Sequence, residues 1–357
     1  MIACGGTGGH LFPGIAVAEE LKSRGHEPLL LISEKKVDAE ASAKYGELEF
    51  EVIPAIAKPP TLSPKMLPFL VRLWRTVSRC RTLLKKHSAD IVLGMGGFTS
   101  LPPVYAGHRL GLPTFVHDSN AHPGKSNVLT SRFCTKVLVG LEAAGSHFPN
   151  RAIEVTGTPV RDEMRALPRR EEACAKFGLE QGKKTIMVMG GSQGAMNLNT
   201  LVVGASKELG EEYQWLHLAG KNDYERVNEL AQELPGHHVL AFCDDMAAAY
   251  AVTDLSICRS GASSLTEMSF LGLPGILVPY PHAADDHQTA NAEVFVEKGA
   301  SVMKQERDMD AEVLAGLVKD LLGDAGRLQT MKEAMKAMSV DDAAGCICDV
   351  LEQSKKG

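Results

Sequence analysis

The amino-acid sequence predicts an α/β protein with two Rossmann-like domains that face each other across a cleft. The 357 residues suffice for two domains of ordinary size, each with its own core. Short apolar runs alternate with amphipathic stretches along the whole chain, a pattern typical of parallel sheets with right-handed crossovers. Each half also begins with an apolar run that leads into a glycine-rich turn.

The apolar runs place strands in both halves of the chain. In the first half we expect strands at residues 28–33, 50–53, 91–93, 114–116 and 136–139, with helices at 13–24 and 98–109. In the second half we expect strands at residues 185–189, 214–218, 239–242, 255–257 and 275–279, with helices at 263–271 and 286–298. The join is expected near Gly157-Thr158-Pro159, because glycine and proline punctuate connections between elements. The default ligand site is then the cleft, at the carboxyl ends of both sheets.

The composition argues against several classes of protein. A net charge of −6 disfavours nucleic acid as a partner. No apolar run reaches the roughly 18 residues of a transmembrane helix, and residues 1–4 leave no room for a signal peptide before the first turn. The eight cysteines form no Cys-x-x-Cys pair, so we expect reduced cytosolic thiols. Cys346 and Cys348 have no second half-site of suitable spacing and are expected in the core, not on a metal.

The first glycine-rich turn, residues 5–9, leads into a predicted helix. Free backbone N–H groups at a helix N-terminus are a ready site for phosphate, although an empty tight turn explains the glycines equally well. Leu11 replaces the third glycine of a dinucleotide-binding turn, which disfavours a nicotinamide-dependent oxidoreductase. His10 lies on the first helical turn, where the helix N-terminus lowers the pKa of an imidazole, so it is a candidate general base. A surface or capping histidine is the alternative.

Two turns in the second half, residues 190–194 and 259–264, also precede helices. Ser263 or Ser264 is a candidate helix cap and Glu267 a candidate ribose ligand, although an ordinary capping box explains the same residues. Two such turns at the ends of neighbouring strands favour nucleotide diphosphate binding. Gln288 and Asn291 offer amides that suit sugar hydroxyls, but amides are also common on solvated helix faces.

Residues 52–89 contain no Asp or Glu. The basic residues of this stretch are Lys58, Lys65, Arg72, Arg75, Arg79, Arg81, Lys85 and Lys86, and the interleaved apolar residues are Met66, Leu67, Phe69, Leu70, Val71, Leu73, Trp74 and Val77. A basic amphipathic helix with Trp and Phe fits a membrane surface that carries anionic lipid. A packed helix with a basic solvated face is the alternative, but the length of the acid-free run favours the membrane.

Several longer motifs follow one another along the chain. They are Gly5-Gly6-Thr7-Gly8-Gly9-His10-Leu11-Phe12-Pro13-Gly14, Gly94-Met95-Gly96-Gly97-Phe98, Gly190-Gly191-Ser192-Gln193-Gly194-Ala195, Asp244-Asp245-Met246-Ala247, Cys258-Arg259-Ser260-Gly261-Ala262 and Gly272-Leu273-Pro274. Together they resemble the MurG family, the N-acetylglucosaminyltransferases of lipid-linked peptidoglycan synthesis. The resemblance covers nearly the whole chain.

The resemblance implies a GT-B type glycosyltransferase. It would transfer N-acetylglucosamine from UDP-N-acetylglucosamine (UDP-GlcNAc) to the 4-hydroxyl of undecaprenyl-pyrophosphoryl-N-acetylmuramyl-pentapeptide, with inversion and without a metal or cofactor. Residues 1–157 would hold the acceptor and the membrane, residues 158–340 the UDP-GlcNAc, and residues 341–357 a helix, over about 341–352, that returns to the first domain. The family works at the cytoplasmic face of the bacterial inner membrane as a peripheral protein, which implies other cell-wall synthesis proteins as partners and a role in cell shape and division.

The resemblance also assigns the site residues. On the acceptor side, His10 would take the proton of the attacking hydroxyl, Thr7, Gly8 and Gly9 would bind the pyrophosphate, and Asn120 would border the cleft. On the donor side, Ser192 and the turn Ala262, Ser263, Ser264 and Leu265 would face the diphosphate, Glu267 the ribose, Arg161 and the backbone of Cys243 the uracil, and Gln288 and Asn291 the sugar.

The chain departs from the family pattern in a few places. Asp118-Ser119-Asn120 stands where the family has Glu-Gln-Asn, and Ala57-Lys58-Pro59-Pro60 replaces an arginine-bearing glycine loop. Only four residues precede the first turn, so a short first strand is expected, and Thr158 replaces an asparagine. Another UDP-sugar transferase or an epimerase of the same fold is the alternative function, and a non-catalytic nucleotide-sugar sensor is an alternative of a different class.

Overall fold

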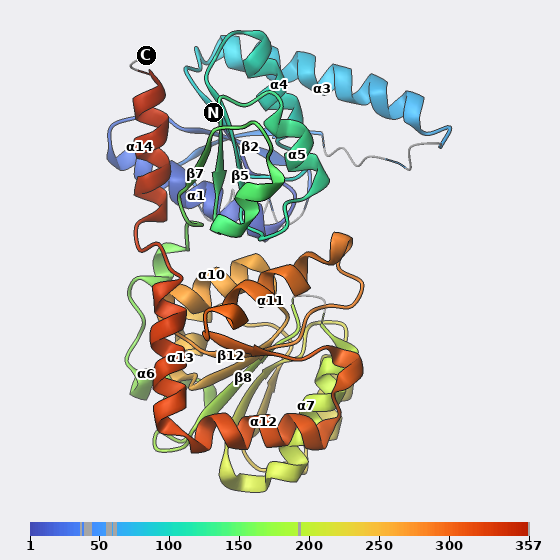
Figure 1. Cartoon of the computed structure of the whole chain (residues 1–357), viewed down its shortest axis with the longest axis vertical. Coiled ribbons are helices and arrows are strands. Elements are labelled where there is room, and N and C mark those ends of the chain that lie inside the picture. Colours follow the sequence, from blue (N-terminus) through green and yellow to red (C-terminus); the bar gives the residue numbers. More distant parts are fainter. Residues whose placement is uncertain (36–37, 39–44, 55–58, 60–62, 192–193, 356–357) are drawn as a thin grey trace. The chain divides into compact units, whose positions relative to one another are not determined.

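The computed structural model spans the 357-residue chain and describes all of it except residues 36–37, 39–44, 55–58, 60–62, 192–193 and 356–357. The chain forms two compact units (Figure 1). Unit 1 comprises Met1–Arg161 together with Val340–Gly357, and unit 2 comprises Asp162–Ser339. Each unit has one parallel sheet with helices packed against it, so the predicted pair of Rossmann-like domains is confirmed.

The sheet of unit 1 has the strand order β3-β2-β1-β4-β5-β6-β7 among the described residues. Its strands are β1 (Ile2–Ala3), β2 (Leu29–Ser33), β3 (Glu49–Ile53), β4 (Val92–Gly94), β5 (Thr114–Asp118), β6 (Lys136–Val139) and β7 (Ile153–Val155). Its helices are α1 (Gly8–Ser23), α3 (Met66–Lys86), α4 (Leu101–Arg109), α5 (Lys125–Ser131) and α14 (Ala343–Lys355), with a 3₁₀ turn, η1 (Glu142–His147). All strand pairs are parallel, as alternating strands and helices require.

The sheet of unit 2 has the strand order β10-β9-β8-β11-β12-β13. Its strands are β8 (Thr185–Met189), β9 (Gln214–Leu218), β10 (His237–Leu240), β11 (Leu255–Cys258), β12 (Gly275–Leu277) and β13 (Ser301–Met303). Its helices are α6 (Arg170–Phe177), α7 (Met196–Leu209), α8 (Tyr224–Ala231), α9 (Met246–Val252), α10 (Ala262–Leu271), α11 (His287–Glu297), α12 (Ala311–Gly323) and α13 (Ala325–Ala337). The central strands are apolar because helices bury both faces of the sheet.

Each sheet has a point at which its strand order reverses. In unit 1, β1 lies between β2 and β4, and in unit 2, β8 lies between β9 and β11. Connections leave in opposite directions on the two sides of such a point, which opens a crevice at the carboxyl ends of the strands. Both glycine-rich turns of the sequence follow these strands, so each turn lies where open α/β sheets bind ligands.

Several predicted element boundaries differ from those of the structure. The helix predicted from residue 13 begins at Gly8, because Pro13, which is favoured at a first helical position, here lies inside α1. The helix predicted from residue 98 begins at Leu101, since Gly96 and Gly97 adopt positive φ values of 113° and 70° and hold the preceding residues in a turn. The strand predicted at residues 239–242 is His237–Leu240.

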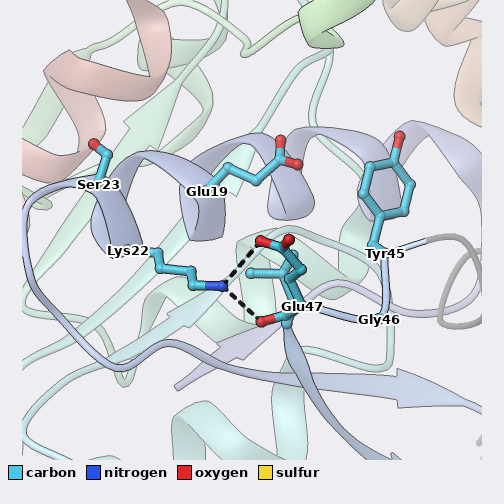
Figure 2. Close-up of a pocket in the computed structure, with 7 residues that line it drawn as sticks. Glu19, Lys22, Ser23, Tyr45, Gly46 and Glu47 are labelled. Atoms are coloured by element: carbon cyan, nitrogen blue, oxygen red, sulfur yellow. Dashed lines mark hydrogen bonds and ion pairs between the residues drawn. The ribbon is translucent and has the colours of Figure 1, made fainter.

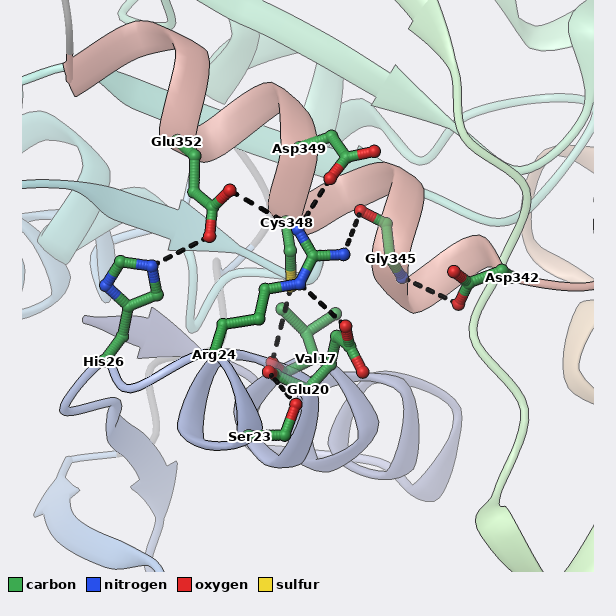
Figure 3. Close-up of polar contacts among 10 residues, drawn as sticks. All are labelled: Val17, Glu20, Ser23, Arg24, His26, Asp342, Gly345, Cys348, Asp349 and Glu352. Atoms are coloured by element: carbon green, nitrogen blue, oxygen red, sulfur yellow. Dashed lines mark hydrogen bonds and ion pairs between the residues drawn. The ribbon is translucent and has the colours of Figure 1, made fainter.

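The last helix, α14, belongs to the core of unit 1. Ile347 and Cys348 are fully buried there beside residues of α1, and the Cys348 thiol contacts the Val17 carbonyl. The Arg24 guanidinium at the end of α1 donates to Asp349 at 2.6 Å (Figure 3). The same figure shows Glu352 beside Arg24 and His26. Buried apolar side chains and a cluster of ion pairs therefore hold the C-terminal segment against α1.

Replacement of Ile347 by Ala is expected to destabilise unit 1 by about 2–4 kcal/mol, because it opens a cavity at a fully buried position. Hydrogen exchange at α1 and α14 should accelerate, while unfolding of unit 2, followed by fluorescence of the buried Trp215, should not change. Leu230→Ala, at a half-exposed position of unit 2, is the matched control. Equal shifts in both units would contradict the assignment of α14 to unit 1.

Candidate functional site

The glycine turn after β1 is held from two sides. A Cβ at Gly5 would lie 2.4 Å from the Ser33 backbone nitrogen, so the two backbones touch. Gly6, at φ 113°, donates its N–H to the buried Asp38 carboxylate at 2.9 Å, and the Lys35 ammonium donates to the Gly6 carbonyl at 2.7 Å. Only glycine fits both positions, and the turn presents a fixed backbone to the crevice.

The N-terminus of α1 follows directly. Thr7 is the N-cap, and its side chain makes no cap hydrogen bond. Gly8 and Gly9 form the first turn with His10, and their backbone N–H groups lack a cap from the Thr7 side chain. These groups and the positive end of the 16-residue helix favour an anion such as phosphate.

His10 is packed onto a second glycine turn, after β4. A Cβ at Gly96 would lie 3.0 Å from the imidazole Nε2, and a Cβ at Gly97 would lie 3.1 Å from Cε1. The imidazole Nδ1 is 3.2 Å from the Thr7 hydroxyl. Burial lowers the pKa of His10, with the nearby Asp118 carboxylate as the largest opposing influence. The imidazole is therefore neutral and able to accept a proton at neutral pH.

A third turn, after β5, completes the edge of unit 1. The buried Asp118 carboxylate accepts hydrogen bonds from the Asn120 backbone N–H at 2.9 Å and the Asn127 amide at 2.7 Å. The Asn127 side-chain oxygen Oδ1 accepts from the Gly97 N–H at 3.0 Å. Asn127 thereby joins the turns after β4 and β5, and through Gly97 it supports the His10 ring.

The glycine turn after β8 has the same close packing in unit 2. A Cβ at Gly190 would lie 2.6 Å from the Ala195 Cβ, and a Cβ at Gly194 would lie 2.7 Å from the Ala219 carbonyl oxygen. α7 begins just after this turn, and its N-cap residue, Ala195, makes no side-chain cap hydrogen bond. Ser192, the residue assigned to the diphosphate, lies outside the described residues.

The turn after β11 leads into α10, and the expected cap is wrong. The N-cap is Gly261, so Ser263 and Ser264 lie within the first helical turn with Ala262, and neither side chain caps the helix. The backbone of Gly261 is extended and Ala262 starts the helix immediately, which leaves no position before the helix for a serine cap. Leu265 closes the turn from a buried position. The first-turn N–H groups of α10 are therefore not capped by the N-cap residue.

Arg259, beside this turn, has a structural role. Its guanidinium donates to the Val278 and Pro279 carbonyl oxygens at 3.1 Å each and is paired with Glu306. It therefore ties the turn after β11 to the end of β12, and its charge is neutralised by the protein.

The predicted ribose and uracil residues of unit 2 lie close to α9. The Tyr250 hydroxyl donates to Glu267 at 2.9 Å, which fixes this carboxylate on α10. The Cys243 thiol is buried and donates to the Asp245 carbonyl at 3.2 Å, which holds the backbone between β10 and α9. Phe242 is half exposed next to it.

The two predicted sugar-binding amides brace the turn after β11. Asn291 is fully buried and donates its amide to the Ser260 carbonyl at 3.1 Å. The Gln288 side-chain oxygen accepts from the Tyr280 N–H at 2.9 Å, and its backbone carbonyl accepts from the Ser260 hydroxyl at 2.7 Å. Both residues thus lie beside the turn that leads into α10.

Two family models match the chain: the glycosyltransferase family 28 N-terminal domain over residues 1–139 and the C-terminal domain over residues 185–346. A UDP-N-acetylglucosamine--N-acetylmuramyl-(pentapeptide) pyrophosphoryl-undecaprenol N-acetylglucosamine transferase of Halothermothrix orenii is 34% identical over 99% of this chain and 98% of its own length. A protein of the same name from Geobacter metallireducens is 36% identical over 100% of this chain and 98% of its own. The chain belongs to the MurG family of N-acetylglucosaminyltransferases.

Solved structures agree with this family. MurG of Acinetobacter baumannii is 27% identical, covers 99% of this chain and 98% of its own, and superposes with a TM-score of 0.78. A UDP-GlcNAc 2-epimerase of Neisseria meningitidis reaches a TM-score of 0.70 with 13% identity, covering 99% of both chains, which shows a shared fold alone. The resemblance drawn from the motifs is confirmed, and epimerases share the fold with this chain at low sequence identity.

In this member of the MurG family, one residue predicted to lie near the uracil, Arg161, belongs to unit 1. Arg161 is the last residue of the first segment of unit 1, where its guanidinium lies 5.4 Å from the centre of the Phe12 ring. The other residues predicted to bind the nucleotide belong to unit 2. Lys58, predicted as part of the basic stretch, lies outside the described residues.

Sequence reasoning missed the residues that support the MurG-family site. Asp38 and Lys35 fix the first turn, and Asn127 links the next two. Their signal in the sequence is weak, because each one gains its role only from the strand order that brings several carboxyl ends together. The departure at Asp118 is also explained, since its carboxylate is bound within its own turn.

A surface cavity of unit 1 lies away from these turns. It has a volume of about 490 Å³ and lies between the end of α1 and the residues before β3, at the amino edge of the parallel sheet (Figure 2). The Lys22 ammonium crosses it to the Glu47 carbonyl at 2.8 Å. Its position opposite the glycine turns separates it from the candidate site.

Two buried histidines of unit 2 predict an acid-sensitive fold. Burial lowers the pKa of His217 to about 3 and that of His237 to about 4, from 6.5. Below pH 6.5 the unfolded chain binds more protons than the folded chain, so stability is full above that pH and falls as the pH drops toward 4. Near pH 5 we expect a loss of roughly 2 kcal/mol for each histidine.

Urea unfolding of a Trp74→Phe variant, in which Trp215 is the remaining tryptophan, measures this loss. His282→Gln, at an exposed histidine of the same unit, should leave the pH dependence as it is. Equal stability of unit 2 near pH 8 and near pH 5 would contradict the prediction.

Proposed function

We propose that this chain transfers N-acetylglucosamine from UDP-GlcNAc to the 4-hydroxyl of undecaprenyl-pyrophosphoryl-N-acetylmuramyl-pentapeptide, with the acceptor on unit 1 and the donor on unit 2. Both substrates carry a diphosphate. Each unit has, beside the point where its strand order reverses, a glycine turn and a helix whose N-cap residue makes no side-chain cap hydrogen bond. That pairing of two phosphate-type sites with two diphosphate substrates is the observation that carries the proposal.

The chemistry assigns the acceptor to unit 1. Inverting transfer needs a base at the attacking hydroxyl, and His10 is a neutral imidazole beside the N-terminus of α1. The acceptor pyrophosphate would bind the N–H groups of Thr7, Gly8 and Gly9. Asn120, held by Asp118, would border the bound acceptor.

The donor would lie along the turns of unit 2. The first turn of α10, from Ala262 to Leu265, would bind the diphosphate through its backbone, together with Ser192. Glu267 would accept from the ribose, and Gln288 and Asn291 would face the sugar while they brace the turn after β11. The backbone at Cys243 would lie near the uracil.

The reaction would be a single displacement. The muramyl 4-hydroxyl oxygen forms a bond to the anomeric carbon as the bond between that carbon and the UDP oxygen breaks, which inverts the configuration. The hydroxyl proton moves to His10, and UDP leaves with the additional negative charge. Backbone N–H groups and helix dipoles at α10 would stabilise this charge, so the residues present provide for the reaction without a metal.

The product tests this proposal. Radiolabelled UDP-GlcNAc with a soluble lipid-linked muramyl-peptide analogue should give a β-1,4-linked disaccharide, in an amount equal to the UDP released. UDP-N-acetylmannosamine as the product, or no disaccharide, would contradict it.

Replacement of Asp118 by Asn should lower acceptor turnover about 10–100-fold. The new NH₂ group would face the Asn120 N–H or the Asn127 amide, and two donors cannot pair, so the turn that supports His10 shifts. UDP affinity should not change, since Asp118 lies in unit 1. Steady-state kinetics with both substrates and calorimetry with UDP measure the two effects. Acceptor turnover within twofold of wild type would contradict the role of this carboxylate.

The surface of α3 supports a peripheral membrane site on unit 1. Leu67 and Trp74 are 71% and 72% exposed, while Phe69 on the opposite face is buried and meets Phe98 edge to face. The exposed basic residues of the helix include Arg72, Arg75, Arg79, Arg81, Lys85 and Lys86. Among the described residues, no helix is long and apolar enough to cross a membrane. Exposed apolar side chains beside cations fit the anionic lipid of the cytoplasmic face of the inner membrane, where the acceptor lipid resides.

A further inference from the structure

Five buried side chains behind the glycine turn of unit 2 form one continuous hydrogen-bond chain. The Ser206 hydroxyl lies 2.8 Å from His237 Nδ1, and His237 Nε2 lies 3.0 Å from His217 Nδ1. His217 Nε2 lies 3.1 Å from the Asn199 side-chain oxygen, and the Asn199 amide lies 2.7 Å from the Asp223 carboxylate. None of the five is more than 9% exposed. The chain runs from α7 through β10 and β9 back to α7 and ends before α8.

The chemistry of the donors fixes one direction along this chain. The Asp223 carboxylate can only accept, so the Asn199 NH₂ faces it and the Asn199 oxygen faces His217. His217 Nε2 must then carry a proton, and its Nδ1 accepts from His237 Nε2. His237 Nδ1 accepts from the Ser206 hydroxyl. Each imidazole is neutral and has one tautomer.

The Asn199 end of this hydrogen-bond chain contacts the glycine turn of unit 2 through the Ala219 carbonyl. The Asn199 NH₂ also donates to the Ala219 carbonyl at 2.9 Å, and that carbonyl is packed against Gly194. Arg226 holds Asp223 through two nitrogens at 2.7 Å each and donates to the Met196 carbonyl at 3.2 Å. The chain therefore sets the position of the turn and of the first residue of α7.

We propose that this hydrogen-bond chain positions the glycine turn of unit 2 for the donor diphosphate, with His217 as its central positioning residue. The proposal rests on the proposed donor site. His217 is fully buried and acts through Asn199, without contact to the substrate. The family motifs mark the turn itself, whereas the two histidines that support it come from β9 and β10.

The same hydrogen-bond chain limits the binding of UDP-GlcNAc at acid pH. In the neutral arrangement His217 Nδ1 accepts from His237, so protonation of His217 at Nδ1 would remove that acceptor and break the arrangement. The charged and titratable groups around His217 are His237, Asp223 and Arg226, and the adjacent His238 lowers the pKa of His237 further. Asp223 favours the protonated form of His217, whereas burial, His237 and Arg226 oppose it. UDP affinity should therefore be constant near neutral pH and fall in the acid range.

His217→Leu tests the proposal. It removes the donor to Asn199, so the dissociation constant of UDP and the KM for UDP-GlcNAc should rise about tenfold, the size expected for one lost hydrogen bond. The KM for the acceptor and kcat at saturating donor should stay within about twofold, because unit 1 is unchanged. His217→Gln places an amide N–H near the former Nε2 and should restore UDP affinity to within about threefold of wild type.

A matched control separates positioning from stability. Gln214 lies on the same strand and is equally buried, but it bonds Glu180, Lys183 and Thr185 at the amino edge of the sheet. Gln214→Leu should lower the melting temperature and leave UDP affinity unchanged. If His217→Leu does not fold, Ser206→Ala, which removes the single hydroxyl at the far end, should raise the UDP dissociation constant about threefold.

Three results would overturn the proposal. They are wild-type UDP affinity in the folded His217→Leu or Ser206→Ala protein, failure of the Gln variant to restore affinity, and an equal loss of affinity in Gln214→Leu. A wild-type protein that binds no UDP would instead overturn the proposed donor site, and this inference with it.

Discussion

His10→Ala should lower kcat about 10²–10⁴-fold, the usual contribution of a positioned general base. The His10 imidazole packs against both the first turn of α1 and the glycine turn after β4. UDP affinity should survive, because the proposed donor site lies in unit 2. Steady-state turnover with the acceptor analogue and calorimetry with UDP provide the two readouts.

The pH dependence of kcat is a second test of His10 as the general base. Burial lowers the pKa of His10 from the ordinary value of 6.5. The acid limb of the kcat profile, where the base becomes protonated, should therefore lie below pH 6.5. His108→Ala, at an exposed histidine of α4 in the same unit, should retain wild-type turnover. A His10→Ala protein with turnover within threefold of wild type would show that another group takes the proton.

Reversal of Arg72, Arg75 and Arg79 to Glu should lower binding to anionic vesicles at least about 100-fold. Each basic residue near an anionic surface contributes about 1 kcal/mol, so the loss of three costs about 3 kcal/mol before repulsion by the new carboxylates is added. All three are exposed on α3, beside the exposed Trp74. Sedimentation with vesicles of phosphatidylcholine and phosphatidylglycerol, at several salt concentrations, measures the effect.

A control with the same change in net charge separates the α3 surface from general electrostatics. Lys207, Lys298 and Lys319 are exposed on unit 2, and their reversal to Glu should weaken vesicle binding far less. Turnover of a water-soluble acceptor analogue should be unchanged in the α3 variant. Vesicle binding of the α3 variant equal to wild type would refute the membrane surface.

Sequence patterns predicted the central strands because burial requires apolar side chains there. The predicted strands at 136–139, 185–189 and 214–218 match β6, β8 and β9 residue for residue. The strands β7 and β13 were not predicted, since each has three residues and only one of those six is buried. A short, exposed strand carries no apolar signal that separates it from a loop.

The candidate site was predicted in part, through residues next to glycine turns. His10 and Glu267 were found because they follow such turns closely in the sequence. Asn127 and the pair of His217 and His237 could not be found in this way, since their partners lie 18–30 residues distant and meet only after the sheet forms. The start of α1 was misplaced for a local reason, because Pro13 favours a first helical position more strongly than an interior one.

Hydrogen exchange in the presence of each ligand tests most directly whether the two diphosphates bind separate units. UDP should slow exchange at the start of α10 and at the Gly190–Gly194 turn of unit 2, and leave residues 5–11 unchanged. The acceptor analogue should slow exchange at residues 5–11 and at the turn after β5, and leave α10 unchanged. Protection of α10 by the acceptor alone, or of the α1 turn by UDP alone, would contradict the assignment of the substrates to the two units.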